Sequence, residues 1–199
     1  MALISVSNNA LQNITAVPAS VPSGALVLLS TQTASSSASL SFTSGIDSTY
    51  DSYVFKYINI HPQNDGVQFR FQTSTDGGSN YGVTNTSTYF IAYHNEADTE
   101  TDLTYITGSD QAQTTNDIAL GSGDNANDSG IAGTLQIFNP SSTTYVKHWI
   151  NRSINDPSSY AQDEFQAGYF NTTSAVNAIR FQMSSGNIDD GIIKMYGVK

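Results

Sequence analysis

The chain has no cysteine and few charged residues. Only 12% of its 199 residues are Asp, Glu, Lys or Arg, which is about half the share found in ordinary soluble domains. Without cysteine the protein has no disulfide bond and no thiolate metal site. Packing and hydrogen bonds must therefore stabilise the fold.

Basic residues are the scarcest charged group. Seven Lys and Arg stand against 17 Asp and Glu, which gives a formal net charge of −10 and a pI near 4.3. Clusters of Lys and Arg supply most of the affinity of a protein for a phosphate backbone. We therefore expect neither nucleic acid nor an anionic membrane as a partner, and we expect no cofactor.

Long hydrophobic runs are missing as well. The apolar run over residues 25–29 is too short to span a bilayer. Residues 1–10 lack the basic residue that opens a signal peptide. We therefore expect synthesis in a cytoplasm without a secretion signal.

Residues 1–23 are predicted to form an extended N-terminal arm, because Pro18 and Pro22 favour an extended backbone. Two interpretations remain open: a loose terminus, or a segment that drapes over a neighbouring subunit. In the second interpretation its aliphatic residues bind the partner, and these are Leu3, Ile4, Leu11 and Ile14.

Residues 24–199 are predicted to form one all-β domain, because apolar and polar residues alternate with a period of two in segment after segment. The predicted strands are 25–30, 38–42, 53–60, 67–72, 81–94, 103–107, 131–138, 143–150, 164–170, 176–183 and 191–196. The turn residues at 61–66 predict a hairpin between the third and fourth of these. Residues 95–117 are expected to be a long loop with one short strand. The pattern indicates a two-sheet antiparallel β-sandwich, jelly-roll-like, and no repeat suggests a propeller.

The sequence offers little support for catalysis or metal binding. The three histidines, His61, His94 and His148, have no metal-ligand spacing, and no Gly-x-Ser-x-Gly motif is present. A glycosidase could use a carboxylate pair. The adjacent acids Asp163 with Glu164 and Asp189 with Asp190 should point to opposite faces of a strand.

The loop 121–130 is rich in oxygen ligands, but it departs from the calcium-binding EF-hand pattern at Ala126 and has no closing Glu. A solvated turn is the favoured interpretation, with calcium as the alternative.

Several sequence runs together resemble a known family. They are GALVLLSTQTA at 24–34, FTSGIDSTYD at 42–51, YINIHP at 57–62, TSTDGGSNY at 73–81, FNPSST at 138–143 and IKMYG at 193–197. The set resembles small virion structural proteins of tailed bacteriophages, especially those of marine bacteria and cyanobacteria. The resemblance implies a decoration, tail or fibre component made in the host cytoplasm, with no catalytic residues.

The expected function is therefore structural, through contacts with other copies of the chain and with capsid, tail or adaptor proteins. We expect a symmetric homo-oligomer, with a trimer as the first guess. Aromatic anchors at its interface are predicted at Tyr50, Tyr53 and Tyr89. The alternative is a carbohydrate-binding adhesin module that contacts a glycan of the host surface. A depolymerising glycosidase is a third and disfavoured hypothesis.

Overall fold

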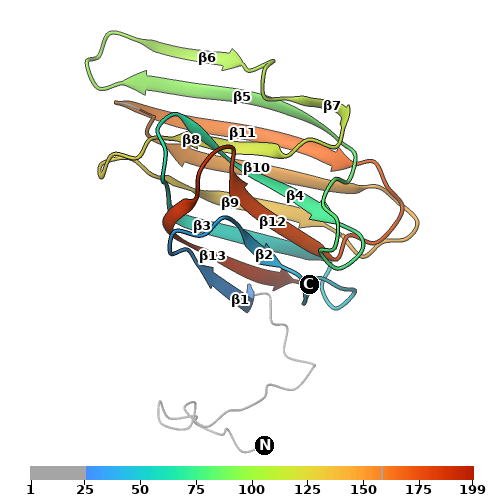
Figure 1. Cartoon of the computed structure of the whole chain (residues 1–199). Helices are drawn as coiled ribbons and strands as arrows, with labels where there is room; N and C mark the ends of the chain where they lie inside the picture. The colour runs from blue at the N-terminus through green and yellow to red at the C-terminus, as the bar shows by residue number, and fades with distance from the viewer. Residues whose placement is uncertain (1–25, 158) are drawn as a thin grey trace, which may run out of the picture.

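The computed structural model describes residues 26–157 and 159–199, which form two antiparallel sheets packed face to face (Figure 1). The predicted β-sandwich is confirmed. The arm residues Leu3, Ile4, Leu11 and Ile14 lie outside the described residues. The described part has no helix that could cross a bilayer.

Thirteen strands make up the two sheets. They are β1 (Val27–Thr33), β2 (Leu40–Phe42), β3 (Ser52–Pro62), β4 (Val67–Ser74), β5 (Asn85–Asn95), β6 (Thr101–Tyr105), β7 (Gln111–Thr114), β8 (Ile118–Gly123), β9 (Ile131–Phe138), β10 (Lys147–Asn155), β11 (Tyr160–Phe170), β12 (Ala178–Met183) and β13 (Ile188–Val198).

One sheet is much wider than the other. The nine-stranded sheet has the order β1-β13-β3-β9-β10-β11-β5-β6, with β7 also paired to β5, and the four-stranded sheet has the order β2-β12-β4-β8. From β2 to β5 the chain crosses between the sheets at every step, and it crosses again around the meander β9–β11. This winding is that of a jelly roll in which the meander takes the place of a single strand.

The predicted hairpin between β3 and β4 is wrong. β3 pairs with β13 and β9, whereas β4 pairs with β12 and β8 in the other sheet. The turn after β3 therefore carries the chain across the sandwich. The aromatic sides of the two strands meet face to face in the core, where the Tyr57 and Phe69 ring centroids lie 5.4 Å apart.

Aromatic rings fill the space between the sheets. The ring of Phe181 on β12 has four ring neighbours with centroids 5.6 to 6.3 Å away, and these are Phe42, Phe55, Phe69 and Phe71. Trp149 on β10 packs edge-on against Phe71 at 5.3 Å and is 1% exposed. Aromatic pairs of this kind add to the stabilisation from burial.

A backbone irregularity changes the faces of β3. Asn59 has a φ of +49°, and the pairing of β3 with β9 shifts between Tyr57 and Ile60. The sequence predicts that Ile58 and Ile60 share a face, but Ile58 is 40% exposed and Ile60 is fully buried. The extra residue of a β-bulge explains this difference, because it reverses the alternation beyond it.

Two strands were missed by the sequence pattern. β7 lies within the predicted long loop, and β8 begins before and extends into the predicted 121–130 loop. β8 contains Gly121 and Gly123, and a Cβ atom on either glycine would contact Ile131 at 3.1 to 3.2 Å. Glycine is therefore used here for the close packing of β8 on β9, not for a turn.

We predict that Gly168→Ala destabilises the fold, because a Cβ at Gly168 would lie 2.6 Å from the Trp149 ring and 2.5 Å from the Thr86 carbonyl oxygen. Overpacking of this kind costs about 1–3 kcal/mol. Chemical denaturation should show this loss in the free energy of unfolding. The control is Gly108→Ala, whose Cβ would have no neighbour within 4 Å. Equal stability of the two variants would contradict the packing of β11 on β10.

Candidate interaction surface

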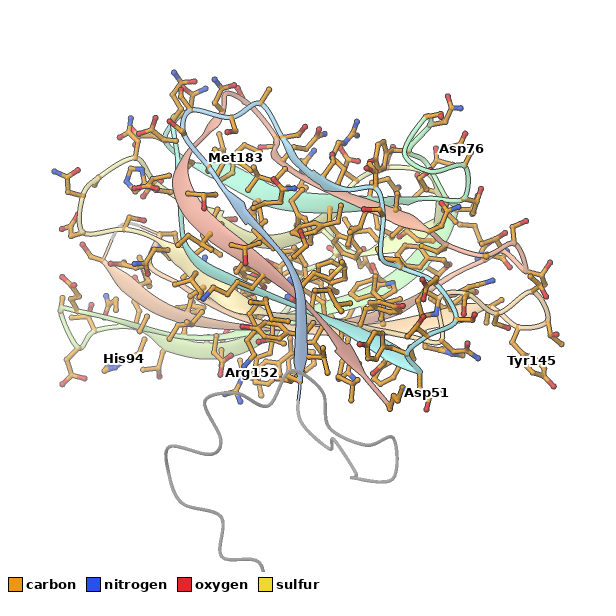
Figure 2. All side chains as sticks on the ribbon, turned by 90° about the horizontal axis from the view of Figure 1, so that it is seen from below. Asp51, Asp76, His94, Tyr145, Arg152 and Met183 are labelled. Carbon is orange, nitrogen blue, oxygen red and sulfur yellow. The ribbon has the colours of Figure 1, made fainter. Side chains whose placement is uncertain are left out.

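The nine-stranded sheet has one face on the core and one face that the four-stranded sheet does not cover. We call the uncovered side the outer face, and Figure 2 shows Arg152 pointing away from the sandwich on this side. Large apolar side chains are exposed along it, between 37% and 67%, and these are Leu28, Ile58, Phe90, Leu103, Tyr105, Phe138, Ile150 and Ile154. Contiguous apolar surface of this kind marks an interaction site in a soluble protein.

An aromatic cluster forms the centre of the outer face. The Phe90 and Phe165 rings stack with centroids 5.0 Å apart and planes 5° from parallel. The Arg152 guanidinium lies 4.9 Å from the Phe165 centroid. Asp163 accepts two hydrogen bonds from Arg152, at 3.0 and 2.6 Å, so the cation is fixed over the ring. A hollow of about 400 Å³ adjoins these residues and is lined also by Ile150 and Ala167.

An acidic cleft opens at one end of the outer face. Its volume is about 880 Å³, and two of its lining residues, Ala132 and Ile154, face each other across β9 and β10 on the outer face. None of the Lys or Arg residues in the described part of the chain lines it. The acidic lining residues are Glu96, Asp128, Asp156, Asp189 and Asp190.

His61 and His94 both line the acidic cleft, although the sequence predicts no convergence of the histidines. Each has its own partner: His61 Nε2 lies 3.0 Å from the Ala126 carbonyl oxygen, and His94 Nε2 lies 3.0 Å from Asp98 Oδ1. His61 belongs to β3 and not to the following turn. Among residues 26–157 and 159–199, no three His, Asp or Glu side chains are placed to hold a metal ion.

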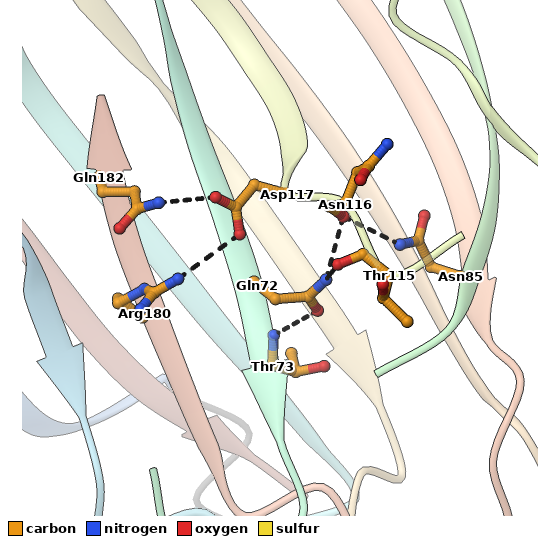
Figure 3. A network of polar contacts seen from close by, with 8 residues as sticks. All are labelled: Gln72, Thr73, Asn85, Thr115, Asn116, Asp117, Arg180 and Gln182. Atoms are coloured by element: carbon orange, nitrogen blue, oxygen red, sulfur yellow. Dashed lines mark hydrogen bonds and ion pairs between the residues drawn. The ribbon is translucent and has the colours of Figure 1, made fainter. Parts of the chain in front are cut away.

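A polar hollow lies on the outside of the four-stranded sheet, beside the network in Figure 3. There Asp117 accepts a 2.6 Å hydrogen bond from Gln182 Nε2 and pairs with Arg180 at 3.6 Å. Gln72 Nε2 donates to the carbonyl oxygens of Thr115 and Asn116 at 3.0 Å each. These bonds fix the segment before β8 against β4 and β12. The hollow has a volume of about 570 Å³, and its polar lining includes Gln68, Arg70, Ser109, Gln111 and Asn116.

A buried carboxyl group lies between the sheets. Glu164 on β11 is fully buried, and burial raises its pKa to about 7. Its Oε2 accepts a hydrogen bond from the Tyr89 hydroxyl at 2.5 Å, and its Oε1 accepts one from Gln162 at 2.8 Å. Burial, and next the Glu164 charge, raise the pKa of Tyr89. Tyr89 therefore donates its proton in a hydrogen bond inside the sandwich.

The predicted aromatic anchors do not lie on the outer face. Tyr53 is fully buried and Tyr89 is 4% exposed, so neither side chain can reach a partner. Tyr50 is half-buried and packs on Tyr53 with centroids 5.9 Å apart. Tyrosine in a strand is compatible with either face, and the alternation does not say which face is inside. The alternation does not predict the exposed aromatic side chains, which are Phe90, Tyr105, Phe138 and Tyr145.

The two carboxylate pairs differ in their placement. Asp163 bonds to Arg152 on the outer face and Glu164 points into the core, which confirms the predicted separation. Asp189 and Asp190, however, are both exposed and both line the acidic cleft. The reason is that β13 is irregular here, with register shifts on either side of Asp190.

The 121–130 segment makes turn contacts. Gly66 N donates to Asp124 Oδ1 at 2.8 Å, and Asn125 Nδ2 donates to the Gln63 carbonyl oxygen at 3.2 Å. The segment thus packs on the turn that follows β3, as the favoured interpretation of a turn expects.

We predict that Glu164 makes stability depend on pH. Its pKa is near 4.5 when unfolded and about 7 when folded, so the folded protein binds the extra proton between these values. Stability should therefore fall as the pH rises through this window, by about 3 kcal/mol. Glu164→Gln should remove this loss, while Glu96→Gln, which changes an exposed carboxyl, is the control. Denaturation curves from pH 4 to pH 8 that stay parallel for wild type and Glu164→Gln would contradict the buried carboxyl.

Comparison with known proteins gives no indication of the function. No protein-family model, curated protein or solved structure matches the chain.

Proposed function

We propose that the chain is a structural component of a tailed-phage virion, either a capsid decoration protein or part of a tail or fibre. It acts through contacts with other copies of itself and with other virion proteins, and it performs no chemical step. The observation that carries the proposal is the outer face, which holds apolar side chains across strands from β1 to β6. The sequence runs that resemble phage virion proteins support the same proposal.

The outer face has the features of a protein interface. Its centre holds aromatic rings and an arginine, and these residue types dominate binding hot spots. Phe90, Phe165 and Arg152 are already fixed by stacking and by the bond to Asp163, so little side-chain freedom would be lost on binding. The interior, in contrast, is occupied by packed aromatic rings and by internal hydrogen bonds.

The virion proposal predicts that this polypeptide is found in purified particles of the phage that encodes it. Mass spectrometry should detect it after particles are washed and banded. Ile150→Asp, which places a charge on the outer face, should lower its incorporation at least tenfold. Tyr145→Asp is the control, because Tyr145 is 70% exposed and lies outside the paired strands. Particles that lack the wild-type chain, or that incorporate both variants equally, would contradict the proposal.

A second candidate function is glycan binding at the host surface, and the polar hollow on the four-stranded sheet favours it. Its polar side chains are amides, hydroxyls, Arg70 and Asp117. Such groups exchange hydrogen bonds with sugar hydroxyls, and a hollow of about 570 Å³ lies within the size range of small-ligand sites.

If the second candidate is correct, a glycan array should give a signal that Arg70→Ala reduces at least tenfold. Lys199→Ala is the control, because it also removes one cation, at the exposed C-terminus. A blank array for the wild-type protein would exclude this role of the hollow.

A further inference from the structure

Two lysines stand side by side on the outer face without a negative partner. Lys56 on β3 and Lys194 on β13 are directly opposite each other in the sheet. Neither forms an ion pair within the described part of the chain. Lys56 Nζ lies 5.7 Å from the Tyr196 ring centroid. Like charges opposite each other destabilise a sheet, so this pair calls for a negative charge from outside the molecule.

The charges on the outer face are arranged in rows across the strands. One row runs from Lys194 through Lys56 and Thr134 to Arg152, because these residues are register partners on β13, β3, β9 and β10. We call it the basic row, and it holds three of the seven basic residues of the chain.

Two residues further along the same strands comes the apolar row. It consists of Ile192, Ile58, Ala132 and Ile154. The acidic cleft follows directly beyond this row and shares Ala132 and Ile154 with it. On β13, β3, β9 and β10 the outer face therefore changes from basic to apolar to acidic over a few residues.

We propose that a second copy of this chain covers the outer face, related by a two-fold axis that runs across the strands along the apolar row. Rotation about this axis lays each apolar row on its counterpart. It also reverses the strands, so that the basic row of each copy lies over the acidic cleft of the other. Both charge contacts form twice, as an isologous interface requires.

The charges select this axis over the other face-to-face arrangement. A two-fold axis along the strands would place basic row on basic row and acidic cleft on acidic cleft. In the proposed pair, Lys194 of one copy lies near Asp190 of the other, and Arg152, which keeps its bond to Asp163, lies near Asp156. Each copy carries a net charge of −10, so association needs such local pairing of unlike charges to offset the general repulsion.

This inference deepens the proposed function, since it names the partner of the outer face, and it gives a two-fold contact in place of the expected trimer. Its test is independent of the virion test. A chain that is present in particles but monomeric in solution would contradict the two-fold pair alone, whereas a chain that pairs in solution but is missing from particles would contradict only the virion role.

Charge reversal followed by sedimentation analysis of the full chain tests the pairing. The variant Lys56→Glu with Lys194→Glu should weaken dimerisation by at least about tenfold. Adding Asp189→Lys and Asp190→Lys should restore it and returns the net charge to that of the wild type. The control is Arg70→Glu with Lys199→Glu, which has the same net charge as the first variant but leaves the outer face unchanged.

Cross-linking tests the position of the axis. Packed sheets lie about 10 Å apart, so a short bismaleimide should join two copies of Ile154→Cys, which lie on the axis. Ile150→Cys is the matched control on the same strand and face. Two copies of it would be displaced by about 26 Å along the strands. The chain has no cysteine of its own to interfere.

Preferential cross-linking of Ile154→Cys together with rescue by the double exchange supports the proposal. A monomeric wild type, a trimer, equal cross-linking of the two cysteine variants or failure of the rescue would each overturn it. Unfolding curves of every variant show whether the fold is retained. Should the lysine reversal instead abolish binding to an added polyanion while the chain stays monomeric, the partner is not a second copy.

Discussion

A layer of aromatic rings between the two sheets determines which side of each neighbouring strand faces inward. Phe181 and its ring neighbours take contributions from both sheets, and the strands must turn their aromatic side toward this layer. The sheet with nine strands is wider than its four-stranded partner. The four-stranded sheet covers part of one of its faces, and no other strand of the described residues covers the opposite face.

Along β10, polar residues lie inside the sandwich and apolar residues lie outside it. On β10, the residues Asn151 and Ser153 are buried while Ile150 and Ile154 are about half exposed. The buried side chains meet β8 and the Glu164 network, where Asn155 donates to the Ser122 carbonyl oxygen at 2.6 Å. A polar layer that is hydrogen-bonded costs little to bury, and it leaves the isoleucines free for an external contact.

Sequence alternation was sufficient to predict the fold class and most strands, because a half-buried strand shows its period of two directly. The alternation does not show which side of β10 faces the core, because both sides carry apolar residues. It also failed at Ile60, where a bulge reverses the faces, and at β8, where glycines serve packing. The hairpin error at 61–66 has a related cause, because turn residues do not reveal whether the next strand lies beside the previous one or across the core.

The same limitation explains the misplaced anchors. Tyr53 and Tyr89 are predicted as anchors because they are aromatic, but both lie inside the sandwich, where Tyr53 bonds to Asp47 and Tyr89 to Glu164. The outer face is not evident in the sequence, because its residues come from segments that are distant in the chain and adjacent only in the sheet. Phe90 and Phe165, for example, are far apart in the sequence and stack on neighbouring strands.

The proposed virion function requires the outer face to be a contact surface in the particle. Imaging the intact particle at a resolution that traces this chain tests it most directly. The proposed function predicts protein density in van der Waals contact with Phe90, Ile150 and Ile154. An outer face that is open to solvent in every copy, with neighbours attached through the four-stranded sheet instead, would contradict it.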